Sequence, residues 1–271
     1  MRKFSKAVSL ILALALIFGS MTLAFAADEK SAAAGGVSGN NSGQKSDKIV
    51  ILYTNDVHCS IDANIGYAGL AAYKNDKLAE TDYVTLIDAG DAIQGEAIGT
   101  LSKGSYISDI MDFIGYDYAV PGNHEFDYRS KGLAKMLETA AESGDTVPEL
   151  LVCNINWDAM EQQGFSEGQQ QIRDAFTEYG VKDYVMVQKG DVRVALLGVF
   201  GKDALACAPT CELQFTDPVE AVKKTVAEIK KNEDADIIVC LSHSGTSEDE
   251  SKSEDEILAK KVPDLDVIVS A

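Results

Sequence analysis

Residues 49–58 read Ile-Val-Ile-Leu-Tyr-Thr-Asn-Asp-Val-His, an apolar run that ends in a carboxylate and an imidazole. An apolar run of this length, bounded by polar residues, is typical of a strand buried on both faces. Similar runs occur at 83–91 (YVTLIDAGD), 118–127 (YAVPGNHEFD) and 237–243 (IIVCLSH), and each of them also ends in short polar side chains. This repeated pattern predicts strands whose carboxyl ends carry candidate functional side chains.

Short apolar runs alternate with longer amphipathic stretches along the rest of the chain. The other strand runs are 149–153, 184–187, 192–199 and 266–270, and the expected helices are 69–80, 105–114, 131–143, 218–231 and 253–260. Gln188-Lys189-Gly190-Asp191 is a hairpin signal, so at least one strand pair should be antiparallel. The alternation predicts an α/β protein with a mixed sheet covered by helices.

The first 26 residues are predicted to be a secretory signal. A basic start at Arg2, Lys3 and Lys6 is followed by the apolar stretch 7–26, which closes with the small-x-small pattern Ala24-Phe25-Ala26. A run of about 20 apolar residues could also span a membrane, and this alternative stays open. We expect the mature protein to be secreted, extracellular or in the cell envelope, without a stable membrane anchor after cleavage.

Residues 27–47 are rich in Gly, Ser, Ala and Asn and show no apolar period, which predicts a flexible linker. The folded domain is therefore expected over residues 48–271. The chain has 24 basic and 43 acidic residues among 271, a formal charge of −19. This balance argues against non-specific nucleic-acid binding, which depends on Lys and Arg contacts to phosphates. It does not exclude anionic substrates, because a bound metal ion can override the local field.

The five cysteines leave two alternatives open. Cys207-Ala-Pro-Thr-Cys211 could close a small loop by a disulfide in an oxidising compartment. Otherwise all five are apolar fillers or free thiols. The cysteines form no paired CxxC set, which excludes a structural zinc ribbon.

The chain has three histidines, and each follows a strand run. Ligands bind beyond the carboxyl ends of strands in open α/β sheets, so several polar side chains should face one crevice. These are Asp56, His58, Asp91, Asn123, His124 and His243. Each alone fits a turn or a core residue, but together they favour a site for Zn, Mn, Fe or Co. A carboxylate can bridge two such cations, and paired cations perform in-line displacement at phosphorus.

The strings DVH at 56–58, GD at 90–91, GNHEFD at 122–127 and SH at 242–243 resemble the motif series of the calcineurin-like metallophosphoesterases. Their order and spacing are most similar to the secreted bacterial 5′-nucleotidase, UDP-sugar hydrolase and 2′,3′-cyclic phosphodiesterase branch. The resemblance covers residues 48–271. It implies mixed β-sheets in a sandwich flanked by helices, an α/β/β/α arrangement, and two divalent metal ions.

The resemblance also implies a role for each motif residue. The metal ligands would be Asp56 and His58 for the first cation, Asp91 between both, and Asn123 and His243 for the second. His124, oriented by Asp127, would form the catalytic dyad that contacts the phosphoryl group or protonates the leaving oxygen. Asn123 and His124 would bind the substrate. Glu125 matches the family string, and we expect it to hold the loop without a chemical role.

The family pattern continues with Gly-His-x-His, or Gln in place of the last His, directly after a strand like 266–270. The resemblance implies that this motif supplies one ligand to each metal, and the printed sequence does not contain it. A C-terminal substrate domain, which stacks on the nucleobase, is expected in a full-length relative. We therefore expect a fragment or premature stop with weak or no activity. The alternative is a complete short product with degraded metal affinity.

We hypothesise a secreted metal-dependent phosphoester hydrolase that acts on nucleotides or related small phosphates through a hydroxide activated by two metals. The alternative is a catalytically inactive secreted fragment that binds a metal or ligand. A third interpretation is a structural cell-envelope protein with core histidines. The acidic stretches 248–250 and 254–256 are expected to be a solvated loop and helix face.

Overall fold

The computed structural model describes residues 45–143 and 148–271. The predicted signal and most of the predicted linker lie outside the described residues. Within the described ranges, no helix has both the length and the apolar character that a membrane crossing requires.

The first sheet is made of strands that follow one another along the first half of the chain. Its order is β1 (Val50–Thr54), β2 (Val84–Asp88), β3 (Tyr118–Ala119) and β4 (Glu149–Leu150), and all three pairings are parallel. All five residues of β2 are buried, which explains its uninterrupted apolar run. Because the strands are parallel, their carboxyl ends meet at one edge of the sheet.

The second sheet contains the predicted hairpin. Its order is β5 (Tyr184–Lys189), β6 (Val192–Phe200), β7 (Ile237–His243) and β8 (Val267–Ser270). The β5–β6 pair is antiparallel, and the pairs β6–β7 and β7–β8 are parallel. Gly190 takes a φ of +63° in the hairpin turn, a conformation that glycine adopts without strain. The prediction of a mixed sheet is confirmed here, whereas the first sheet is wholly parallel in the described residues.

The five helices expected from the sequence are present. They are α2 (Gly66–Glu80), α4 (Ser105–Ile114), α5 (Arg129–Ser143), α9 (Pro218–Asn232) and α10 (Glu254–Lys261). The structure also contains helices that the sequence patterns did not predict: α3 (Ala97–Ser102), η1 (His124–Phe126), α6 (Trp157–Gln163), α7 (Glu167–Tyr179) and α8 (Lys202–Ala206). The signal for α7 was available, because Ser166 and Gln169 form a complete capping box at its start.

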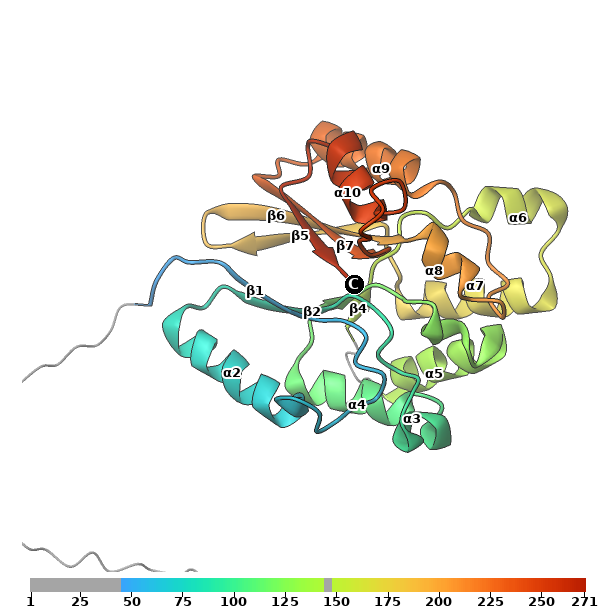
Figure 1. Cartoon of the computed structure of the whole chain (residues 1–271), viewed down its shortest axis with the longest axis horizontal. Helices are drawn as coiled ribbons and strands as arrows, with labels where there is room; N and C mark the ends of the chain where they lie inside the picture. The colour runs from blue at the N-terminus through green and yellow to red at the C-terminus, as the bar shows by residue number, and fades with distance from the viewer. Residues whose placement is uncertain (1–44, 144–147) are drawn as a thin grey trace, which may run out of the picture. The chain divides into compact units, whose positions relative to one another are not determined.

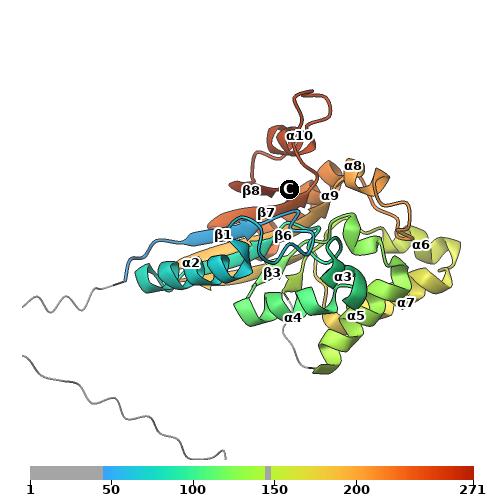
Figure 2. The same cartoon turned by 60° about the horizontal axis from the view of Figure 1, so that its bottom comes forward.

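Three apolar clusters hold the layers together. One joins the helices of the first half to the first sheet, through side chains such as Leu86, Met111 and Leu137. Another packs α9 and α10 on the second sheet, and a third lies between the two sheets. Figures 1 and 2 show helices α2, α4 and α5 on the outer side of the first sheet and α9 and α10 on the outer side of the second. This is the expected α/β/β/α sandwich.

All five cysteines are free thiols in the structure. Of the two alternatives for Cys207 and Cys211, the structure therefore shows the unbonded one. Burial raises the pKa of the Cys211 thiol to about 11, and the negative charge of Glu212 acts in the same direction.

Candidate metal centre

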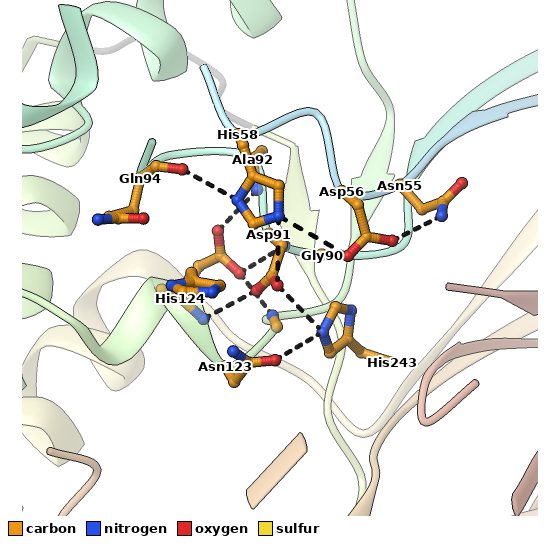
Figure 3. A network of polar contacts seen from close by, with 12 residues as sticks. Asn55, Asp56, His58, Gly90, Asp91, Ala92, Gln94, Asn123, His124 and His243 are labelled. Atoms are coloured by element: carbon orange, nitrogen blue, oxygen red, sulfur yellow. Dashed lines mark hydrogen bonds and ion pairs between the residues drawn. The ribbon is translucent and has the colours of Figure 1, made fainter. Parts of the chain in front are cut away.

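The structure brings all six predicted side chains to one edge of the two sheets (Figure 3). Four strand ends deliver them: β1 precedes Asp56 and His58, β2 precedes Asp91, β3 precedes Asn123 and His124, and β7 ends at His243. Since these strands come from both sheets, the centre lies where the carboxyl ends of the two layers meet.

Asp91 is the middle of the arrangement. It is only 3% exposed, and its Oδ2 lies 3.9 Å from His58 Nε2 and 3.5 Å from His243 Nε2. Its Oδ1 accepts a hydrogen bond of 2.8 Å from the backbone N–H of His124. Two groups of possible metal donors share this carboxylate, and within each group the donor atoms lie within 4.8 Å of one another. The groups are Asp56, Asp91 and His243, and His58, Asp91 and His124.

His243 is held in one tautomer by the backbone. Its Nδ1 donates to the carbonyl oxygen of Ala89 over 2.7 Å, so the lone pair of the neutral ring is on Nε2. Nε2 lies 3.2 Å from Asn123 Oδ1 and 3.5 Å from Asp91 Oδ2, and because both of these atoms are acceptors, only a protonated Nε2 can donate to them. Burial lowers the pKa of His243, but the hydrogen bond and charge of Asp91 outweigh it and raise the pKa to about 9. The position therefore favours a cation.

His58 lies on the other side of Asp91, and a backbone carbonyl also fixes its tautomer. Its Nδ1 donates to the carbonyl oxygen of Gln94 over 3.2 Å, which leaves the Nε2 lone pair facing Asp56 Oδ1 at 4.0 Å and Asp91 Oδ2 at 3.9 Å. These separations are too long for hydrogen bonds. Asn55 donates to the second oxygen of Asp56 over 2.7 Å and so orients the carboxylate.

The backbone at these positions is unusual. Asp56, His58 and Asp91 have φ values of +50°, +49° and +61°, in the left-handed region that non-glycine residues seldom occupy. Backbone hydrogen bonds join the two loops; among them, Asp56 N–H donates to the carbonyl oxygen of Gly90 over 3.0 Å and His58 N–H to that of Asp91 over 2.9 Å. Such strain persists only where the surroundings determine the conformation, and it is frequent at functional sites.

Glu125 helps to hold these loops in their unusual conformation. Its carboxylate is 8% exposed and accepts backbone N–H groups from two loops. The donors are Asp91 at 2.8 Å, Ala92 at 2.9 Å, Ile93 at 3.2 Å and Gly122 at 2.5 Å. Burial raises the pKa of Glu125, and the charge of Asp91 acts in the same direction. The expectation that Glu125 holds the loop is confirmed.

His124 and Asp127 form the expected pair. His124 Nδ1 lies 2.7 Å from Asp127 Oδ2. Burial lowers the pKa of His124, but the hydrogen bond to Asp127 and the charge of Asp91 produce a net rise. The ring of His124 meets that of His58 edge-on at a centroid distance of 5.0 Å. The geometry thus allows His124 to act either in the dyad or as a donor to a cation beside His58.

One residue at this edge was misjudged from the sequence. Asp255 was expected on a solvated face, but it is only 4% exposed and packs against the ends of β7 and β8. It accepts hydrogen bonds from Ser242 Oγ at 2.6 Å, Gly245 N at 3.1 Å and Ser270 Oγ at 2.5 Å. A signal was present, because Asp255 precedes Leu258 and Val262 by three and seven residues, the spacing of the buried helix face.

The donor set fits divalent cations. Imidazole and carboxylate suit Zn and the neighbouring transition metals, and both candidate ligand histidines donate their other ring nitrogen to a backbone carbonyl, as metal-bound histidines usually do. In both places an imidazole Nε2 lies beside side-chain oxygens that can only accept, so a cation could take the place of a proton there. The residues therefore fit the metal site that the motif series implies.

Comparison with known proteins identifies a matching family and several similar proteins. Residues 49–271 match the family described as calcineurin-like phosphoesterase. The trifunctional nucleotide phosphoesterase protein YfkN of Bacillus subtilis is 27% identical over 82% of this chain and 15% of its own length. The 5′-nucleotidase of Bos taurus is 26% identical over 82% of this chain and 37% of its own.

Solved structures share the fold. The 5′-nucleotidase precursor of Thermus thermophilus superposes with a TM-score of 0.64 at 24% identity, over 82% of this chain and 41% of its own. The NAD nucleotidase of Haemophilus influenzae gives a TM-score of 0.63 at 23% identity, over 82% and 37%. The chain thus spans well under half the length of these similar proteins.

Proposed function

The chain belongs to the calcineurin-like phosphoesterase family, and on this premise we propose that it is a metal-dependent hydrolase of phosphoesters, acting on nucleotides or related small phosphates. One observation carries the proposal: Oδ2 of the buried Asp91 lies 3.9 Å from His58 Nε2 and 3.5 Å from His243 Nε2. A shared carboxylate between two imidazoles is the arrangement that two neighbouring cations require.

The proposed ligand assignment is the one that the family resemblance implies, and the short distances to Asp91 support it. Asp56 and His58 would hold one divalent ion, Asn123 and His243 the other, and Asp91 both; Zn, Mn, Fe and Co all suit this donor set. When bound, such a pair supplies a nucleophile at neutral pH and neutralises charge on the phosphoryl group. Asn123 contributes a neutral oxygen, so it adds no negative charge beside an anionic substrate.

His124 is proposed to handle the proton. Asp127 fixes its Nδ1 and its pKa is raised, so the ring keeps a proton to higher pH than a free imidazole would. A protonated His124 donates to the leaving oxygen as the bond to phosphorus breaks, and Asn123 and His124 together orient the substrate. If His124 instead served as a metal ligand, its removal would release an ion.

Nucleotides are the proposed substrates because several similar proteins bear the name 5′-nucleotidase. The C-terminal substrate domain expected in full-length relatives is consistent with the share of those proteins that the chain spans. We also propose that the protein acts outside the cytoplasm after removal of residues 1–26. Mass spectrometry of the exported product tests this, and an N-terminus at Ala27 is the expected result.

Metal content and turnover test the proposal together. The predicted mature product, residues 27–271, is loaded with Mn or Zn, its ions are counted, and hydrolysis of a nucleoside monophosphate is measured. Two ions per chain with hydrolysis support the enzyme. One ion or none, without turnover, favours the alternative of an inactive binding module. The expected weak activity of this polypeptide stays a prediction, and turnover near that of an intact two-domain homologue would contradict it.

His124 variants separate its two roles. His124→Ala and Asp127→Asn should each lower kcat by about 10²- to 10⁴-fold, the usual contribution of a general acid, while both ions stay bound. Loss of one ion in His124→Ala, but not in Asp127→Asn, would show that His124 is a ligand.

A further inference from the structure

A pocket of about 530 Å³ opens beside the metal centre. This volume lies within the range of small-molecule sites. Asp56 and His58 form one part of its wall, so the pocket is continuous with the candidate centre. The remaining wall consists of the end of β1, the loop into α2, the start of α2, and Glu96, which precedes α3.

The wall is rich in apolar surface that faces solvent. Tyr53 is 53% exposed and Ile65 is 67% exposed, although both are large apolar side chains, and the buried Tyr67 and Leu70 also line the pocket. Exposed apolar side chains gathered around a hollow mark a binding surface more often than isolated ones do. Asn64 adds an amide that makes no side-chain hydrogen bond within the described residues.

The pocket wall contains acidic side chains but no Lys or Arg among the described residues. The acidic side chains are those of Asp56 and Glu96. A cation bound at Asp56 would neutralise that carboxylate, and Glu96 would then remain as a negative charge. A second phosphate or a carboxylate entering the pocket would find no positive side chain and would be repelled.

We propose that this pocket binds the uncharged organic group of a phosphomonoester whose phosphoryl group lies at the metal centre. The inference rests on the proposed function and narrows it: the preferred substrate carries a single phosphoryl group, and the rest of the molecule is uncharged and presents an apolar or aromatic face to the pocket. Diphosphates, whose second phosphate would have to enter beside Glu96, are disfavoured.

Binding of phosphonates, which are not hydrolysed, tests the pocket without turnover. Calorimetry on the full chain loaded with Mn compares phenylphosphonate with methylphosphonate. Wild type should bind the phenyl compound more tightly. In Ile65→Ala this preference should fall about five- to tenfold, since roughly 50 Å² of apolar contact is lost, while methylphosphonate affinity stays constant. Leu101→Ala is the matched control, because Leu101 is 85% exposed and lies outside the pocket wall.

A charge-reversal variant tests the electrostatic part. Glu96→Lys should improve binding of 4-carboxyphenylphosphonate about tenfold relative to phenylphosphonate, and Glu96→Gln should give a smaller gain. Equal preferences in wild type, Ile65→Ala and Leu101→Ala, or no gain in Glu96→Lys, would overturn the pocket assignment even if phosphomonoesters are hydrolysed. If neither phosphonate binds, the pocket assignment and the proposed function both fail.

Discussion

The two sheets contribute to the candidate centre in different ways. The first sheet sends Asp56, His58 and Asp91 from loops beyond its strands, with backbone in the left-handed region. The second sheet presents His243 as the last residue of β7, where the pairing with β6 still continues at Phe200. A buried carboxylate contributes to each side, Glu125 in the loops of the first and Asp255 at the strand ends of the second.

The partners of these two carboxylates differ. Among the described residues, Glu125 accepts hydrogen bonds only from backbone N–H groups, which can donate and can never accept. Asp255 accepts two serine hydroxyls and one N–H, and a hydroxyl can rotate to accept instead. The loops beyond the first sheet therefore need the carboxylate of Glu125, because only an acceptor can bond to their N–H groups. The ends of β7 and β8 should tolerate replacement of Asp255 better, because hydrogen bonds between the strands already hold them.

The largest effect is expected at the residue that joins both sides. Asp91→Ala removes the oxygen shared by both donor groups, so ion affinity and turnover should fall more than about 100-fold, beyond the loss typical of outer-shell changes. Ion content and hydrolysis rate measure this. Asp109→Ala, an exposed carboxylate on α4, should leave both unchanged. Two ions retained in Asp91→Ala would remove Asp91 from the centre.

Glu125→Gln should cost about 2–4 kcal/mol of unfolding free energy, because an amide NH₂ would face backbone N–H groups left without an acceptor. Urea denaturation measures the change. Glu161→Gln, at an exposed position of α6, serves as the control. A cost below 1 kcal/mol would show that the loops are held by other contacts.

Asp255→Asn should cost only about 1 kcal/mol, since the hydroxyls of Ser242 and Ser270 can accept from the new amide. The same denaturation experiment applies, with Glu256→Gln on the exposed side of α10 as the control. If Asp255→Asn destabilised the protein as much as Glu125→Gln, the distinction between the two sides would be wrong.

The smallest effect is expected for a link between the two halves that lies on the surface. Lys182 pairs with Glu149 of β4 over 2.6 Å, and both side chains are about half exposed. Lys182→Ala should cost about 0.2–1 kcal/mol because solvent screens the pair. Thermal unfolding at low and high salt checks this. A larger, salt-independent loss would mean that the surface joins the halves as firmly as the buried carboxylates do.

Much of the fold could be predicted from the sequence because its strands are buried on both faces and read as continuous apolar runs. The gathering of His58, His124 and His243 also followed from their places after strands. The helix α7 and the inward turn of Asp255 were missed. A polar helix start resembles a loop, and the burial of one carboxylate depends on the distant strand ends that surround it.

The hydrogen bond between His243 and Ala89 spans 154 residues of chain. Contacts between such remote positions require closure of a long loop, and they are late events in the folding of topologies dominated by non-local pairing. A polypeptide that has folded only its first sheet therefore holds Asp91 and His58 without their counterpart. On the proposed function, capture of both ions would mark the finished fold, and ion uptake followed during refolding would report when the two sheets have packed together.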